Sequence, residues 1–193
     1  KDPKTESEWK NYLVVNGASA PQIEYTVDDD GTVVPWDFDS AMMLTVYNHL
    51  ERSREYFDTI NADGLGISGQ TVGQEVGRMK CYYYPGLAIL GIPLPLFTDN
   101  AAYAYTADAF LIPPRLSLAD AVPIYANRGV ITHEFGHAVF NRLVHNNRRG
   151  TTPLVEKWEE NAIVALNELG GLDEGIADVF GALDTKDPDF IAY

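Results

Sequence analysis

Two histidines, His133 and His137, stand four residues apart in the stretch "ITHEFGHAVF", and Glu134 directly follows the first. On an α-helix, residues four apart share a face, so both imidazoles can direct a ring nitrogen at one metal ion. Glu134 lies roughly 100° around the helix from His133, where its carboxylate can reach a water molecule on that ion. The pattern predicts a zinc site with Glu134 as general base, although matches of this length also occur by chance in structural helices.

The residues around this pattern predict a buried helix. Apolar side chains occur nearly all round it, namely Val130, Ile131, Phe135, Ala138, Val139, Phe140, Leu143 and Val144. Ionisable groups in such surroundings are costly unless they are paired or bound to metal. Gly136 costs a helix about 1 kcal/mol relative to alanine, so we expect a close neighbour at that position.

A catalytic zinc site takes three protein ligands and keeps one coordination position open, so a third ligand is required. His145 follows His137 by eight residues, which is about 12 Å along a continuing helix and too far to share the ion. His49 belongs to a separate stretch and is interpreted as a surface or packing histidine. The two remaining histidines are therefore poor candidates.

The segment "GGLDEGIADVFGAL" offers a better one. Its apolar residues fall on one helix face, and Glu174 and Asp178 stand side by side at a spacing of four. Two like charges so placed repel each other unless positive charge lies near. We expect Glu174 to be the third ligand and Asp178 to orient a ligating histidine through its ring N–H. The alternatives are that Asp173 or Asp178 is the ligand, or that Asp173 and Glu174 only stabilise a helix N-terminus.

Other elements must position these helices. "QIEYTVDDDGTVVPWDF" predicts a hairpin with its turn at Asp30-Gly31, and "SAMMLTVYNHLERSREYF" predicts a helix. From Cys81 to Pro114 the pattern is that of strands, and "NAAYAYTADAFLI" alternates like a single strand with two faces. Three helices are expected after Pro123, over residues 128–145, 154–169 and 172–183, with breaks at "RRGTTP" and at Gly170-Gly171.

These expectations define an α+β fold. A β-rich lobe that also contains the long helix is expected over residues 1–122. A helical part that carries the zinc ligands is expected over residues 123–193. The two parts are expected to form a single catalytic unit.

Composition limits the classes of partner. The formal net charge of −14 among 193 residues argues against nucleic-acid binding, which relies on clustered lysine and arginine. The single cysteine, Cys81, excludes a disulfide within the chain and a zinc site made of several cysteines. No apolar run approaches the roughly 20 residues that span a bilayer, so no membrane span is expected.

The motifs resemble a known family. "HEFGH" followed by a helix reading "DEGIADVFGAL" is similar to the zinc motifs of gluzincin metallopeptidases of the thermolysin and fungalysin type. "DNAAYAYTADAFLIPP" resembles the edge strand that precedes the zinc helix in that family, and "DFDSAMMLTVYNHLERSREYF" resembles its long upstream helix. The resemblance spans roughly residues 38–190.

The resemblance implies a secreted, extracellular zinc endopeptidase that acts on peptide or protein substrates. By motif, His133, His137 and Glu174 match the zinc ligands, Glu134 the general base and Asp178 the residue that orients a ligating histidine. Asn100 and Ala101 match the pair that binds the substrate backbone. Asp189, in "DPDF", resembles one acidic residue of the family's calcium site, so Ca²⁺ is a second cofactor to consider.

The chain also departs from the family. The segment between the two zinc motifs is longer than in thermolysin and contains no tyrosine, so the phenol that helps to hold the transition-state oxyanion has no match there. The family's C-terminal helical domain, which supplies a catalytic histidine and a substrate-binding arginine, has no counterpart before Tyr193. We therefore expect the N-terminal catalytic part of a longer peptidase, and the alternative is a zinc-stabilised binding module without activity.

Overall fold

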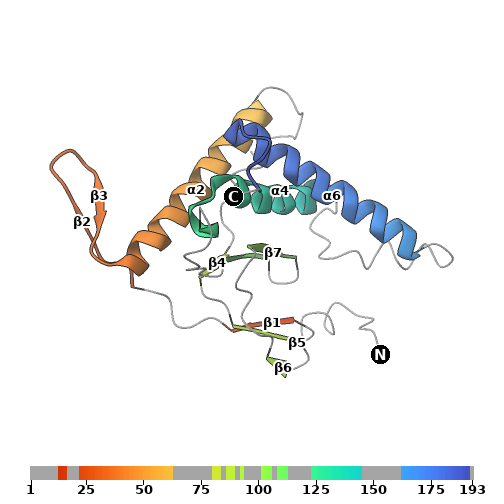
Figure 1. Cartoon of the computed structure of the whole chain (residues 1–193), viewed down its shortest axis with the longest axis horizontal. Coiled ribbons are helices and arrows are strands. Elements are labelled where there is room, and N and C mark those ends of the chain that lie inside the picture. The colour runs from red at the N-terminus through yellow and green to blue at the C-terminus, as the bar shows by residue number, and fades with distance from the viewer. Residues whose placement is uncertain are drawn as a thin grey trace.

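The computed structural model describes residues 13–16, 22–62, 80–83, 86–89, 92–93, 101–105, 108–112, 123–144 and 162–191. Within these ranges, helices and short strands occur together, which confirms the α+β class (Figure 1). The helices are α2 (Phe38–Ala62), α4 (Arg128–Leu143) and α6 (Ala162–Thr185), with a 3-10 turn, η1 (Ile124–Ala126), before α4. None of these helices is long and apolar enough to cross a membrane.

Eight short strands form three small sheets in the described residues. They are β1 (Leu13–Asn16), β2 (Tyr25–Val27), β3 (Val33–Pro35), β4 (Lys80–Tyr83), β5 (Gly86–Ile89), β6 (Ile92–Pro93), β7 (Ala102–Ala104) and β8 (Ala109–Ile112). The strand orders are β1-β5-β6, β2-β3 and β4-β8-β7. In the last sheet β8 pairs parallel with β4 and antiparallel with β7, so β7 lies at an edge.

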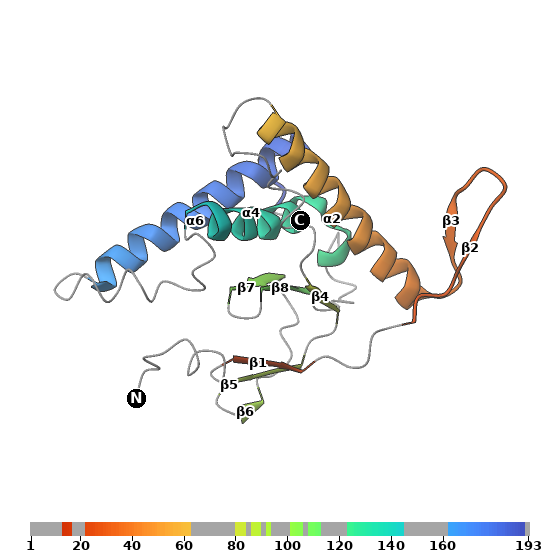
Figure 2. The ribbon, with the colours of Figure 1, turned by 180° about the vertical axis from the view of Figure 1, so that it is seen from behind.

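The hairpin predicted around Asp30-Gly31 is confirmed as β2 and β3. Gly31 has a φ of 86°, a conformation that glycine adopts without a Cβ clash. The carboxylate of Asp30 accepts a hydrogen bond of 2.9 Å from the backbone N–H of Thr32. This hairpin extends beyond the N-terminal end of α2 and away from the other described helices (Figure 2).

The prediction of one strand over "NAAYAYTADAFLI" is wrong, because the stretch folds back on itself. β7 and β8 pair antiparallel, with Tyr103 opposite Phe110. Asp108, just before β8, has a φ of 50°, and aspartate tolerates this left-handed conformation better than most residues. The turn was missed because the small and aromatic residues keep alternating through both arms and no glycine or proline marks it.

The predicted helix break at Gly170-Gly171 is also wrong. α6 runs without interruption from Ala162 to Thr185, and Gly31 is the one glycine of the described residues with a positive φ. Glycine weakens a helix by about 1 kcal/mol but does not end it when helical residues on both sides propagate the hydrogen bonds. The part of the predicted helix 154–169 that precedes Ala162 lies outside the described residues.

α4 lies between the other two helices and the sheet that contains β7, as both whole-chain views show (Figures 1 and 2). Its central residue Phe135 is 1% exposed. The ring of Phe135 stacks on Phe57 of α2 at 5.3 Å and on Phe110 of β8 at 5.7 Å between centroids. The prediction of a buried helix is confirmed, except that Leu143 and Val144 at its C-terminal end are exposed.

α4 and α6 approach each other closely, as Gly136 predicted. A Cβ at Gly136 would lie 3.1 Å from the Cα of Ala177, so only glycine fits without displacing the helices. At the other end of the crossing, the buried ring of Phe190 fills the space that a Cβ at Gly129 or at Gly181 would occupy. These close contacts set the separation of the two helices that carry the predicted metal ligands.

Candidate metal centre

α4 and α6 bring His133, His137 and Glu174 together at one point. The two histidine Nε2 atoms lie 3.0 Å apart, and the Oε2 atom of Glu174 lies 3.4 Å from each of them. Their donor atoms form a group that can hold a metal ion. Both histidine side chains are nearly buried, whereas the carboxylate of Glu174 is largely exposed.

The spacing of the three donor atoms fits a small tetrahedral cation. With metal–ligand distances of about 2.0–2.1 Å, ligand atoms in a tetrahedral site lie roughly 3.3 Å from one another. The observed separations of 3.0, 3.4 and 3.4 Å bracket this value. The helical spacing of the histidines and the close packing of α4 on α6 therefore produce ligand geometry directly.

The opposite ring nitrogens of the two histidines face carboxylates. Nδ1 of His133 lies 2.9 Å from Oδ1 of Asp178, and Nδ1 of His137 lies 2.8 Å from Oδ1 of Asp173. A carboxylate at Nδ1 favours the tautomer that carries its proton there and leaves Nε2 with a free lone pair. Two lone pairs and a carboxylate oxygen then point at one another, an arrangement that a cation stabilises.

Asp178 lies beside His133, one of the two candidate histidine ligands. The other candidate, His137, contacts Asp173, which sequence reasoning did not assign to it. Asp173 was considered only as an alternative ligand or as a helix N-terminal charge. It is buried, with 8% of its surface exposed. Each ligating histidine usually has its own partner, so Asp173, the first carboxylate of "LDEGIAD", was the available signal.

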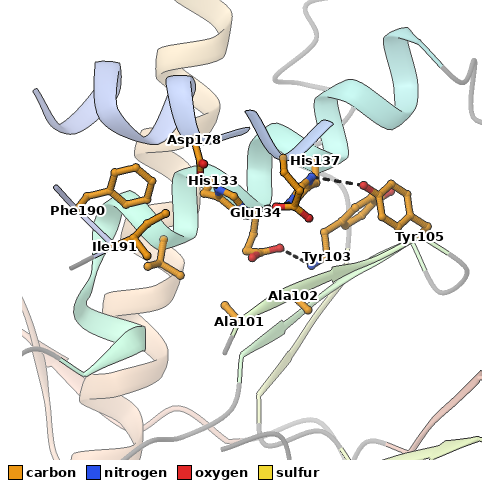
Figure 3. A pocket seen from close by; sticks show the side chains of 12 residues that line it. Ala101, Ala102, Tyr103, Tyr105, His133, Glu134, His137, Asp178, Phe190 and Ile191 are labelled. Carbon is orange, nitrogen blue, oxygen red and sulfur yellow. Dashed lines mark hydrogen bonds and ion pairs between the residues drawn. The ribbon is translucent and has the colours of Figure 1, made fainter. Parts of the chain in front are cut away.

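Tyr105 extends this arrangement to the strand side of the site. Its hydroxyl donates a hydrogen bond to Oδ2 of Asp173 and lies 3.4 Å from Nδ1 of His137. Figure 3 shows the Tyr105 ring beside His137, at the β7 end of the pocket. No local sequence signal identified this tyrosine, because its two contacts come from segments far along the chain.

Glu134 lies in the same pocket, with its carboxylate buried. Its Oε2 accepts a hydrogen bond of 2.6 Å from the backbone N–H of Tyr103 in β7 (Figure 3). Burial raises the pKa of Glu134 to about 7, although His137 and the Tyr103 N–H act in the opposite direction. The carboxyl group is therefore held near the pKa at which a group both takes up and releases a proton at neutral pH.

These residues surround one cavity of about 410 Å³. Its polar wall contains the metal-ligand candidates and Glu134, and its strand wall consists of Ala101, Ala102, Tyr103 and Tyr105. Phe190 and Ile191 lie on the other side of His133 (Figure 3), and with Val130 they form the apolar part of the cavity lining. The cavity is large enough for a peptide segment with one or two side chains.

The other sequence candidates lie elsewhere or are not described. Ala101 lines the cavity, but Asn100 and His145 fall outside the described residues. His49 is on α2, and its surroundings include Ala126, Arg128 and Asp184 rather than the metal ligands. Asp189 is exposed and donates its backbone N–H to Asp187; it does not belong to the metal-binding group of the described residues.

The described site thus combines three convergent metal donors, a buried carboxyl group of raised pKa and a strand edge around one cavity. Such a constellation suits metal-assisted hydrolysis, because it can hold a cation, a proton acceptor and an extended substrate within reach of one another. Comparison with family models, curated protein sequences and solved structures finds no match for this chain.

Proposed function

We propose that the chain is a zinc-dependent endopeptidase. The observation that carries the proposal is the convergence of His133, His137 and Glu174 in the cavity that also contains the buried carboxylate of Glu134. A purely structural metal site needs no buried base and no open cavity beside the ion. The resemblance of the motifs to the thermolysin and fungalysin type points to the same reaction.

The donor set favours zinc. Two imidazole nitrogens and one carboxylate are ligands that zinc accepts in catalytic sites, with the fourth position left for water or substrate. When bound, the ion supplies a Lewis acid that polarises the scissile carbonyl and acidifies a water molecule. Iron(II) also accepts two histidines and a carboxylate, so the metal has to be identified by analysis of the purified protein.

Glu134 is proposed to move the proton. It takes a proton from the attacking water and delivers it to the nitrogen of the leaving amine, which lets the peptide bond break without an unstable anion. The backbone N–H of Tyr103 holds one carboxylate oxygen in place. The other oxygen is then available for the proton, and the burial that raises the pKa of Glu134 makes it a better base.

β7 is proposed to hold the substrate backbone. It is an edge strand of its sheet, and the N–H of Tyr103 points away from β8 toward Glu134. Ala101 and Ala102 precede Tyr103 and line the same cavity. An extended peptide can pair there as an added strand, and the small side chains of Ala101 and Ala102 leave room for it.

The apolar wall suggests which side chains fit. Val130, Phe190 and Ile191 line the cavity, and the exposed side chain of Ile191 is covered when an apolar residue of the substrate enters. Burial of apolar surface is favourable by about 25 cal/mol per Å². We therefore propose that cleavage occurs next to an aliphatic or aromatic residue.

The test is cleavage of a quenched fluorogenic peptide pool by the 193-residue chain loaded with zinc. Glu134→Gln is expected to retain zinc and to lose at least about a hundredfold in kcat, the lower end of the usual effect of a general base. The matched control is Glu55→Gln, an exposed glutamate on α2, which should cleave normally. Mass spectrometry of the products gives the cleaved bonds and tests the apolar preference.

A zinc-stabilised binding module without activity is the rival, because the segment between the two zinc motifs contains no tyrosine to match the one that holds the oxyanion in the resembled family. It predicts that zinc binds and stabilises the chain while no peptide is cut. Cleavage that a chelator abolishes and added zinc restores would exclude it. Cleavage that survives in Glu134→Gln would instead remove Glu134 from the role of base.

A further inference from the structure

Tyr105, Asp173 and His137 form a continuous chain of polar contacts that reaches from the strand side of the cavity to a metal-ligand candidate. The Tyr105 hydroxyl donates to Oδ2 of Asp173, and Oδ1 of the same carboxylate lies 2.8 Å from Nδ1 of His137. The three residues come from the β7–β8 hairpin, α6 and α4. The chain is thus assembled only by the tertiary fold.

We propose that Tyr105 is a positioning residue for the metal centre: by holding Asp173, it fixes the ring orientation and tautomer of His137. This inference rests on the proposed metal site and assigns one more residue to it. A partner that orients a ligating histidine commonly changes metal affinity by about 10–100-fold. Tyr105 does not contact the metal-binding nitrogen of His137 and acts on this histidine through the carboxylate of Asp173.

The burial of Asp173 explains why its carboxylate needs a second partner. Its side chain is 11% exposed, whereas that of Asp178, which faces His133, is 50% exposed. Water can satisfy the free oxygen of Asp178, but it has little access to Asp173. Without the Tyr105 hydroxyl, Oδ2 of Asp173 would lose its donor in a buried place, and the carboxylate would be free to turn away from His137.

The geometry excludes a direct catalytic role for the Tyr105 hydroxyl. It lies on the Nδ1 side of His137, 3.4 Å from that atom, whereas the convergent donors lie on the Nε2 side. A donor to a transition-state oxyanion must point to the side where the substrate carbonyl lies. Tyr105 therefore does not replace the missing phenol of the resembled family.

Tyr103, in β7 two residues before Tyr105, provides a matched control, because its replacement by phenylalanine leaves the backbone N–H that contacts Glu134 in place. Its hydroxyl donates to Asp108 at 2.8 Å and accepts from Asn141 at 3.1 Å, so Tyr103→Phe also removes a hydroxyl from two hydrogen bonds. None of these contacts involves His133, His137 or Glu174. A variant that weakens the fold in general is thereby separated from one that acts on the metal ligands.

The experiment measures zinc affinity by competition with a chromophoric chelator, and the visible spectrum of the cobalt(II) form, for wild type, Tyr105→Phe, Tyr103→Phe and Asp173→Asn. We expect Tyr105→Phe to weaken zinc binding about tenfold and to change the cobalt bands. Asp173→Asn should have an effect at least as large. Tyr103→Phe should stay within about twofold of wild type, and circular dichroism checks that all variants are folded.

Unchanged zinc affinity and cobalt spectrum in Tyr105→Phe would overturn the inference, as would an equal loss in Tyr103→Phe. Loss of kcat with intact zinc affinity would overturn it too, because it would mean direct participation in the reaction. Failure of the proposed peptidase function is read separately: wild-type protein that binds zinc but cleaves nothing leaves the affinity comparison intact. Wild-type protein that binds no zinc would overturn both.

Discussion

At the residue scale, the two nitrogens of each histidine ring have different partners. In His133 and His137 the Nε2 atoms face each other and Glu174, while the Nδ1 atoms face Asp178 and Asp173. Burial lowers the pKa of His133, and the nearby His137 acts in the same direction, so His133 favours the neutral form that binds metal. The site is therefore defined by the candidate ligands together with the carboxylates that face their Nδ1 atoms.

His49 provides a test at this scale away from the metal centre. Burial lowers its pKa, and the cationic side chains of Arg128 and Arg52 act in the same direction, against the carboxylate of Asp184 and the backbone of Ala126. The unfolded chain therefore takes up the proton first as the pH falls, and the folded state loses stability relative to it below about pH 6.5.

We expect the unfolding free energy of wild type to fall relative to that of His49→Gln between about pH 7.5 and about pH 5. Urea titrations of both proteins at each pH measure it, and titrations common to both proteins cancel in the difference. Parallel pH profiles for the two proteins would show that His49 is not held neutral by the fold.

At the scale of elements, the crossing of α4 and α6 determines the site. Gly136 permits the approach to Ala177. A polar network ties the crossing to α2: Ser53 and Thr132 lie 2.8 Å apart through their hydroxyls, and Thr132 donates to Asp184, which pairs with Arg128. Among the described helices, α4 and α6 line the cavity, and they are thereby held to each other and to α2 by both packing and hydrogen bonds.

The glycines of α6 give the prediction at this scale. No atom of the described residues would lie within 4 Å of a Cβ at Gly170 or Gly171, and both are in a continuous helix. Alanine at each should therefore raise the free energy of unfolding by up to about 1 kcal/mol. Urea denaturation measures the change.

Gly136→Ala is expected to change the free energy of unfolding in the opposite direction. The same substitution should destabilise the protein there, because the new Cβ would meet the Cα of Ala177 at 3.1 Å. Destabilisation by alanine at Gly170 and Gly171 would indicate that the helix breaks there after all, as the sequence pattern had suggested.

At the scale of the whole molecule, a bound ion would join α4 to α6 and so couple metal binding to folding. Binding to the folded state alone stabilises it by about 2.7 kcal/mol at a zinc concentration a hundredfold above Kd. The melting temperature of metal-stripped protein should therefore rise when zinc is added and fall again with a chelator.

Glu174→Gln should abolish most of this rise, because the donor from α6 is weakened. Glu168→Gln, an exposed glutamate on the same helix, should leave it unchanged. Differential scanning calorimetry with and without zinc measures both. An equal rise in both variants would place the stabilising zinc away from Glu174.

The sequence by itself determined what local periodicity controls. The shared helix face of His133 and His137 and the hairpin at Asp30-Gly31 each depend on residues near one another in the chain, where backbone geometry is regular. The α+β class followed from the same patterns. Where the local signal was weak or uniform, as at Gly170-Gly171 or between β7 and β8, the predictions were wrong.

Only the tertiary structure decided which partners meet. The contact of Tyr103 with Glu134 joins residues 31 apart in sequence, that of Asp173 with His137 joins residues 36 apart, and that of Tyr105 with Asp173 joins residues 68 apart. Such pairs depend on how the helices and the β7–β8 hairpin pack, and no spacing rule along the chain encodes that packing. The sequence therefore named the candidate metal ligands, and the fold assigned to each histidine its carboxylate and to that of His137 its tyrosine.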